Sequence, residues 1–233
     1  VQTIMTYPLY NGGYKLFAIA DDKIYDCSTA TAVAVYTGLS NAKWQFVNFS
    51  NTSGNYIIAC NGSDPTMIYD GTHWFSLATT STAATISTIT HVGAVATLTT
   101  ATNHGLVTGN KVTISGASPS AYNGSFVVTV TSPTTFTYTM ASTPASNATV
   151  VGAYTVLGIT GVNSSNFINV NLFKNRSWFV EKSSIKVWYL GIDLLAGPAT
   201  AIDFGGIARS GGSLQAMGTW TLDAGQGADD YAV

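Results

Sequence analysis

The stretch "NYIIACNGSDPTMIYDGTHW", residues 55–74, reads as a strand, a polar turn, a second strand and a turn that ends in an aromatic residue. Its two apolar runs are bounded by Asn, Gly, Asp and Pro, the residues that close tight turns. Two similar stretches are "YKLFAIADDKIYDCSTATAVAVY", residues 14–36, and "NRSWFVEKSSIKVWYLG", residues 175–191. The chain therefore contains the same predicted hairpin three times.

The spacing of the three hairpins indicates a repeat architecture. When the first strands are aligned, Phe17 and Ile57 lie 40 residues apart (57 − 17), and Ile57 and Phe179 lie 122 apart (179 − 57). The second strands also match as "KIYD", "MIYD" and "KVWY". A period of about 40 residues with several short strands is typical of β-propeller blades, each of which buries its faces against neighbouring blades.

Aromatic residues that follow the turns are suited to pack between such blades. "NAKWQF" supplies Trp44 and Phe46, and "DGTHW" leads to Trp74 and Phe75. Aromatic side chains contribute large buried areas, so we expect these four between adjacent blades.

The long gap before the third hairpin predicts an inserted domain at residues 79–156. These 78 residues are rich in Thr, Ser, Ala and Val and contain one charged residue, Lys111, whereas the other 19 of the 20 charges lie outside. Removing 78 residues from 122 leaves 44, close to the blade period. Alternating runs such as "VATLTT", bounded by turn residues, predict a small β-barrel or sandwich of about five strands.

The composition bounds the fold class. The chain of 233 residues is 46% hydrophobic and 9% charged, with a net charge of −2. We find no amphipathic helix of three or more turns, no apolar run long enough to span a membrane and no signal peptide. The sequence predicts an all-β protein: a propeller-like body from residues 1–78 and 157–233, interrupted by the insert.

The missing initiator Met and the strand-like ending "DDYAV" lead us to expect a fragment of a longer chain.

Cys27 and Cys60 stand alone, with no CxxC spacing. This spacing argues against a metal site, and we expect both to be small buried apolar residues. Two cysteines in a β protein of this size fit folding in a reducing cytoplasm, and a disulfide lacks support in the sequence.

Paired carboxylates would be needed for glycosidase chemistry. Asp21 and Asp22, and Asp229 and Asp230, are adjacent in sequence, so in a strand they would point to opposite faces and in a turn they would cap. Glu181 is the sole Glu, and no partner carboxylate is placed near it. We predict turn or solvent roles for these residues.

The remaining candidate motifs also favour structural roles. His73, His91 and His104 lie outside any HExxH or GxSxG pattern and are interpreted as turn histidines. "GGIARSGGS", with Arg209, lacks the strand–GxxxxGK–helix context of a phosphate-binding loop. "DDKIYD" and "NGSDPTMIYD" lack the spacing and closing Glu of a calcium loop. We predict no catalytic, cofactor-binding or metal-binding residues, and no cofactor.

Two segments resemble known families. "HGLVTGNKVTISGA…YNGSFVVTVTSPTTFTYTM" is similar to the small β modules inserted into bacteriophage structural proteins, some of which share a likeness of fold alone with a domain of ubiquitin-activating enzyme. The flanks, especially the region from "NLFKNRSWFVEK" to "GADDYAV", resemble the tail nozzle proteins of short-tailed phages, also called tail tubular protein B. The resemblance covers most of the chain and consists of ordered hydrophobic residues and turns.

The resemblance implies a non-enzymatic virion protein of the tail, assembled in the bacterial cytoplasm. It implies a homo-hexameric ring of propeller-bearing subunits below an adaptor ring and the portal, with tail fibres as further partners. Genomic DNA would pass through the bore with only passive contact, in keeping with nine Lys and Arg residues in the chain. Lys174 and Arg176 in "LFKNRSW" are candidates for bonds to neighbouring subunits or strands.

Two other classes of function stay open. One is a host-surface carbohydrate-binding tail adhesin, in which the aromatic residues of the propeller, or the insert, contact glycans. The other is a propeller glycosidase, whose carboxylate pair would have to lie elsewhere in a longer chain.

Overall fold

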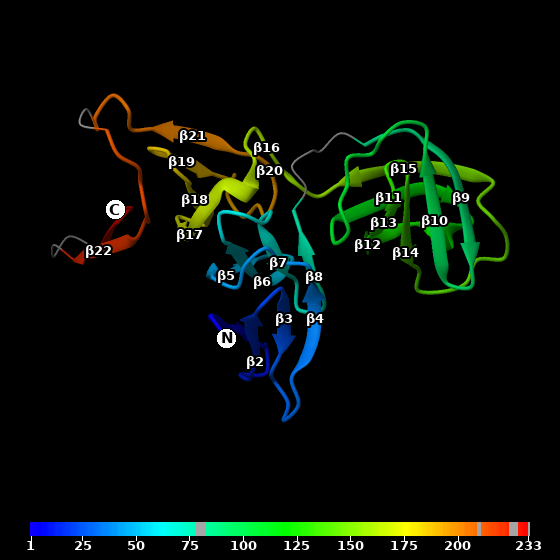
Figure 1. Ribbon diagram of the computed structural model, residues 1–233, viewed down its shortest axis with the longest axis horizontal. Helices are drawn as coiled ribbons and strands as arrows, with labels where there is room; N and C mark the ends of the chain where they lie inside the picture. The colour runs from blue at the N-terminus through cyan, green and yellow to red at the C-terminus, as the bar shows by residue number, and fades with distance from the viewer. Residues whose placement is uncertain (78–82, 209–210, 224–227, 233) are drawn as a thin grey trace. The chain divides into compact units, whose positions relative to one another are not determined.

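The computed structural model describes residues 1–77, 83–208, 211–223 and 228–232 (Figure 1). Throughout these residues the regular structure is β strand, apart from two 3-10 helices at Ser120–Tyr122 and Ser164–Asn166. The all-β prediction is confirmed. None of the helices in the described ranges has the length and apolar character required to cross a membrane.

The chain divides into two units. One comprises Val1–Trp74 with Gly161–Val233, and the other comprises Phe75–Thr160. The predicted insert, 79–156, starts four residues after the second unit begins and ends four before it stops (79 − 75 and 160 − 156). The predicted boundary at residues 78 and 79 lies outside the described residues, and the independence of the insert as a domain stays a prediction.

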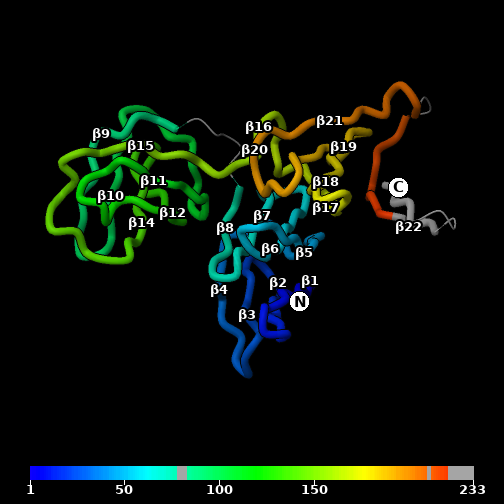
Figure 2. Tube along the Cα trace, turned by 180° about the vertical axis from the view of Figure 1, so that it is seen from behind, coloured from blue at the N-terminus to red at the C-terminus, as the bar shows by residue number. Residues whose placement is uncertain are grey.

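Three four-stranded sheets form the first unit, and each follows the order of its strands along the chain (Figure 2). The first sheet is β1 (Thr3–Pro8), β2 (Tyr14–Ala20), β3 (Lys23–Asp26) and β4 (Val33–Thr37). The second is β5 (Gln45–Asn51), β6 (Gly54–Cys60), β7 (Met67–Tyr69) and β8 (Trp74–Ser76). The third is β17 (Phe167–Phe173), β18 (Arg176–Glu181), β19 (Lys186–Tyr189) and β21 (Thr200–Asp203).

The three predicted hairpins are the second and third strands of these sheets. "KIYD" and "KVWY" coincide with β3 and β19, and "MIYD" contains β7. The pairs β2–β3, β6–β7 and β18–β19 are antiparallel. Short strands outside these sheets are β16 (Ile159–Thr160), β20 (Gly197–Pro198), β22 (Thr219–Asp223) and β23 (Ala228–Ala232), the last two forming a hairpin.

An apolar core joins the first sheet to the second. The ring of Phe17 lies 4.7 Å from that of Tyr69 and 5.3 Å from that of Trp74, in edge contacts. Trp44 is buried in the same core and Phe46 packs against it. The expected role of these aromatic residues between sheets is therefore confirmed, because edge contacts of this kind add to the area they bury.

Phe75 is the exception among the four aromatic residues. It is buried, but it belongs to the second unit, where the Nζ of Lys111 lies 4.5 Å from its ring centroid. Phe75 follows Trp74 directly in β8. Successive strand residues point to opposite faces, so neighbouring aromatic residues cannot enter the same core.

The predicted alignment of the first two hairpins is one residue out of step. Phe17 and Ile57, aligned by sequence, lie in the same core and so face each other from two different sheets. Structurally equivalent residues would point in the same direction along the stack. Because side chains alternate along a strand, a shift of one residue exchanges the two faces.

Hydrogen bonds join the third sheet to the second. The N–H of Gly62, in the loop between β6 and β7, donates to the carbonyl oxygen of Phe167 at 2.7 Å. The Nδ2 of Asn51 donates to the carbonyl oxygen of Asp193 at 2.9 Å. On the face of the second sheet opposite the Ile57 core, Ile58, Cys60 and Ile68 are fully buried. The second sheet is thus buried on both faces.

The second unit contains two open sheets around one core. One sheet has the order β13 (Thr129–Ser132), β14 (Thr135–Thr139), β10 (Val95–Thr100) and β9 (Ile86–Val92). The other has the order β12 (Gly124–Val127), β11 (Lys111–Ser118) and β15 (Val150–Val156). The sandwich alternative is therefore correct and the barrel alternative wrong. The described residues contain seven strands here rather than about five, and the break of "GSFVVTV" at Val128 into two strands accounts for one of the additional strands.

Both ends of this sandwich are hydrogen-bonded to the segment of residues 109–111. The N–H of Ser76, at the start, donates to the carbonyl oxygen of Gly109, and the N–H of Leu157, near the end, donates to that of Lys111, both at 2.9 Å. Asn110 lies between them and donates from Nδ2 to the Oγ of Ser76 at 2.9 Å. The chain therefore enters and leaves the sandwich at neighbouring points.

We expect Gly152 of β15, which lies against β11, to be required for the sandwich. A Cβ at Gly152, where φ is +64°, would collide with the carbonyl oxygen of Ser115 and lie 2.6 Å from the nitrogen of Ala117. Gly152→Ala should lower the free energy of unfolding by about 1–2 kcal/mol from the left-handed backbone and about 1–3 kcal/mol more from the collision. Urea unfolding of the sandwich measures the loss.

Gly93→Ala is the matched control for this substitution. Its φ is +58°, but a Cβ there would have no neighbour within 4 Å, so only the backbone cost should appear. Equal losses for the two variants would contradict the steric argument.

Deletion of residues 79–156, with a short Gly/Ser linker in their place, should leave the three sheets of the first unit folded. The neighbouring ends of the sandwich make such a replacement compatible with the host. Circular dichroism and the unfolding midpoint of the shortened chain measure this. Loss of all cooperative unfolding would contradict the expected independence.

Candidate functional site

Among the described side chains, the Asp21–Asp22 pair and Glu181 belong to different sheets. Asp21 and Asp22 form the exposed turn between β2 and β3. Glu181, at the end of β18, accepts a hydrogen bond at 3.0 Å from the indole Nε1 of Trp188. The side chains of Asp229 and Asp230 lie outside the described part of the chain. These positions give Glu181 a role in holding Trp188.

A buried carboxylate, Asp64, is also structural. Its oxygens accept from the Ser40 N–H at 2.9 and 3.1 Å, from the Ser40 Oγ at 2.6 Å and from the Asn61 Nδ2 at 2.6 Å. These bonds tie the chain between the first two sheets to the loop between β6 and β7. The donors compensate the cost of burying a charge.

His104 is the one fully buried histidine among the described residues. Its Nδ1 accepts from the N–H of Leu106 at 3.0 Å, so Nε2 carries the proton and donates to the carbonyl oxygen of Ser132 at 3.1 Å. His73 lies in an exposed turn, and the Nδ1 of His91 lies 3.1 Å from the carbonyl oxygen of Gly93. Both nitrogens of His104 are thus used within the sandwich.

The two cysteines are free thiols in different environments. Cys60 is buried in the second sheet, and burial raises the pKa of its thiol. Cys27 is half-buried, so the expectation of two buried cysteines is correct only for Cys60. Burial of the thiol in an apolar setting makes Cys60 a poor nucleophile.

Within the ranges that the structure describes, no three His, Cys, Asp or Glu residues gather closely enough to hold a metal ion. Of the motif "GGIARSGGS", Arg209 and Ser210 lie outside the described residues. The described residues of these motifs therefore form no metal-binding cluster.

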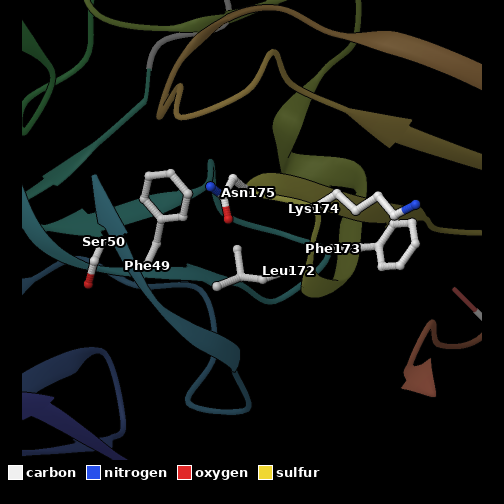
Figure 3. A pocket seen from close by; sticks show the side chains of 6 residues that line it. All are labelled: Phe49, Ser50, Leu172, Phe173, Lys174 and Asn175. Carbon is white, nitrogen blue, oxygen red and sulfur yellow. The ribbon is translucent and has the colours of Figure 1, made fainter. Parts of the chain in front are cut away.

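A cavity of about 300 Å³ lies where the β17–β18 turn approaches β5 (Figure 3). Its walls are apolar side chains with one hydroxyl, one amide and one cation, contributed by Phe49, Ser50, Leu172, Phe173, Lys174 and Asn175. Figure 3 shows Phe49 and Asn175 grouped together, with Phe173 beneath the Lys174 side chain on the other side of Leu172. Lys174 and Asn175 connect β17 to β18 and both have positive φ, +49° and +56°.

A row of aromatic rings with flanking cations continues from this turn across the third sheet. The Trp178 ring lies 6.2 Å from that of Phe173 and 4.7 Å from that of Tyr189. The Nζ of Lys174 lies 5.3 Å from the Phe173 centroid, and the guanidinium of Arg176 lies 5.3 Å from that of Tyr189. We call these five residues the aromatic strip.

The aromatic strip is suited to binding rather than to catalysis. Its three rings are half-buried and its two cations lie against ring faces, an attractive arrangement for a planar or anionic partner. Arg176 also donates to the carbonyl oxygen of Leu190, the residue directly after β19, at 3.3 Å. The sequence patterns pointed to Lys174 and Arg176 but not to the rings, although alternation in "RSW" and "KVWY" places Arg176 and Trp178 on one face.

Comparison with known proteins gives no relative for this chain: no family model, curated protein or solved structure matches it.

We expect the turn that positions the strip to gain stability from Asn175→Gly. Two-residue hairpin loops with positive φ at both positions favour Asn-Gly, and Asn175 occupies the second position at +56°. Relief of the left-handed backbone is worth about 1–2 kcal/mol, and the greater freedom of Gly in the unfolded chain offsets about 0.4–1 kcal/mol of it, whereas Asn175→Val should cost about 1–2 kcal/mol. Urea unfolding measures both, and effects of the same sign would contradict the predicted turn geometry.

Proposed function

We propose that the three sheets are blades of a β-propeller and that this chain is a structural subunit of the tail nozzle of a short-tailed bacteriophage. The observation that carries the proposal is the set of three four-stranded sheets in chain order, with a small β-sandwich inserted in the sequence between the second and third. This arrangement is the one that the resemblance implies. The proposed location is the virion tail, and the proposed role is non-enzymatic.

Exposed apolar side chains support assembly into a homo-oligomeric ring. Ile4, Tyr14 and Leu16 are 60%, 69% and 38% exposed, and they lie on the face of the first sheet away from the second sheet. Exposed apolar side chains on one face of a sheet are consistent with an interaction surface. A ring of subunits, six by the family resemblance, would shield such surfaces, and the adaptor ring and the tail fibres are the proposed neighbours.

The charges support a bore that conducts DNA without gripping it. The chain has nine Lys and Arg residues, and some are engaged internally. The Nζ of Lys15 donates to the Tyr69 hydroxyl at 2.6 Å, and that of Lys182 donates to the carbonyl oxygen of Gly62 at 3.4 Å. Each phosphate contact by Lys or Arg would add salt-dependent affinity, which would resist movement of the genome.

A second candidate function, a carbohydrate-binding tail adhesin, is favoured by the aromatic strip. Half-exposed rings with apolar faces can stack on sugars, and Phe173, Trp178 and Tyr189 offer three in a row. In that case we would expect a trimer or a peripheral fibre rather than a ring coaxial with the portal.

The mass and symmetry of the assembly test the proposed nozzle. Native mass measurement and electron microscopy of the tail should give a six-fold ring, because the exposed apolar faces require partners. Fluorescence titration with duplex DNA should give weak binding without sequence preference at physiological salt. A stable monomer in the mature particle, a peripheral trimer, or tight sequence-specific DNA binding would contradict the proposal.

A further inference from the structure

The cavity beside the β17–β18 turn has the composition of a small ligand site. Its volume of about 300 Å³ is at the lower limit of ordinary ligand pockets. Phe49 and Leu172 supply apolar surface, whereas Ser50, Lys174 and Asn175 supply a hydroxyl, an ammonium group and an amide. A largely apolar pocket with a small number of polar groups suits a ligand that has both apolar and polar faces.

The aromatic strip begins at the same turn and lies on one face of the third sheet. Phe173 of β17 pairs with Arg176 of β18. Trp178, two residues beyond Arg176, pairs with Tyr189 of β19. Side chains two residues apart in a strand share a face, so the strip presents its rings together. Figure 3 shows the Lys174 side chain extending along the Phe173 ring, away from Phe49, so the cavity and the strip meet at Lys174.

A later part of the chain borders the strip on one side. The Nδ2 of Asn171, which pairs with Trp178, donates to the carbonyl oxygen of Met217 at 3.0 Å. The N–H of Met217 donates to the Oδ1 of Asn169 at 3.1 Å. Trp178 and Tyr189 remain half-buried beside this border. The rings are therefore held in place by their surroundings and keep exposed surface for a ligand.

The strip carries positive charge that its own contacts do not neutralise. The Nζ of Lys174 lies 5.3 Å from the centroid of the Phe173 ring. Arg176 donates to the carbonyl oxygen of Leu190 at 3.3 Å, which uses one of its several N–H donors. Both contacts are with uncharged groups. The exposed Asp193, whose N–H is bonded to the turn, adds one negative charge, so these three charged residues sum to +1 (2 − 1) and favour an anionic ligand.

The row of rings favours a chain of sugars over a single small anion. Half-exposed aromatic rings stack on the apolar faces of sugars, and three rings in succession can contact successive units. Lys and Arg bind carboxylates through charge-assisted hydrogen bonds. Ser50, Asn175 and the Tyr189 hydroxyl can bond to sugar hydroxyls. A nucleic acid is a poorer match, because its closely spaced phosphates require a track of cations and the strip has two.

We propose that the cavity and the aromatic strip together bind an acidic oligosaccharide, a short chain of sugars that carry carboxylates. One sugar occupies the cavity, and the following sugars stack along the strip with their carboxylates on Lys174 and Arg176. The inference rests on the second candidate function, to which it adds the charge of the ligand and the residues that select it. It does not depend on the proposed ring.

Two matched probes test the site. Tetragalacturonate carries a carboxylate on each sugar, and its methyl ester has the same rings without the charge. Isothermal titration calorimetry with the 233-residue chain should show that the acid binds roughly tenfold or more tightly than the ester, because it adds charge-assisted hydrogen bonds. Binding of the acid should weaken as the salt concentration rises, whereas binding of the ester should not.

Lys174→Met separates the charge from the packing. Met keeps an apolar side chain over Phe173 without the ammonium group, so affinity for the acid should fall roughly tenfold and affinity for the ester should not change. Tyr189→Ala should weaken both probes by the same factor, roughly threefold to tenfold, because stacking does not require the carboxylate. Lys43→Met is the matched control, since the exposed Lys43 precedes β5 at the end opposite Ser50, and should change neither affinity. Circular dichroism confirms that each variant is folded.

The outcomes separate this inference from the proposed nozzle. Failure of the folded chain to bind the acid, or an equal loss of affinity for both probes in Lys174→Met, overturns the site. Tighter binding of a thymidine oligonucleotide in competition with the acid assigns the strip to nucleic acid and also overturns it. Binding that is lost in the assembled tail overturns it too, because a neighbouring sheet would then cover the strip. A six-fold ring without sugar binding leaves the nozzle standing, and sugar binding without a ring leaves the site standing.

Discussion

Burial of the second sheet on both faces is the constraint on which the first unit depends. An isolated four-stranded sheet with Ile57 and Met67 on one face and Ile58 and Ile68 on the other would expose two apolar surfaces. Apolar burial is the dominant favourable term in folding, so this sheet requires a neighbour on each side. The aromatic core supplies one contact and the third sheet supplies the other. The outer face of the first sheet carries the exposed Ile4, Tyr14 and Leu16, whereas the β17 strand of the third sheet is hydrogen-bonded to Met217 through Asn169 and Asn171.

Much of this architecture could be predicted from local patterns. Turn residues and alternating apolar residues located the hairpins, and the predicted bounds of the insert, 79–156, lie within four residues of those of the second unit, 75–160. These signals are local, because a turn or a strand face is specified by residues adjacent in sequence. The correct choice between sandwich and barrel was not accessible, since it depends on which strand edges pair across the whole module.

The errors at single residues have a common physical origin. A shift of one residue leaves a predicted strand in place, but it reverses the direction in which each side chain points. The alignment of Phe17 with Ile57 failed for this reason, and Phe75 was assigned to the wrong core because it follows Trp74.

The candidate site was less predictable than the fold. The sequence identified Lys174 and Arg176 as candidates for bonds to neighbouring subunits or strands. The cavity and the aromatic strip could not be predicted, because they depend on how β17, β18 and β19 pack together. The hydrogen bonds of Asn169 and Asn171 with Met217 gave no signal in the sequence. Asn169 and Asn171 resemble ordinary polar strand residues, and their partner, Met217, lies more than forty positions away. Contacts between a side chain and a distant backbone have no periodicity to detect.

The adjacent ends of the sandwich bear on how the protein is made. Its 78 predicted residues delay the third sheet during translation by about 4–16 s at roughly 5–20 residues per second, and through that interval Ile58 and Ile68 have no third sheet to cover them. Once the sandwich folds, Ser76 and Leu157 are held beside the same segment, and a long covalent loop becomes a short one. If the sandwich folds during translation, the third sheet is therefore tethered closer to the second sheet, and the entropy lost when the two sheets pack is smaller.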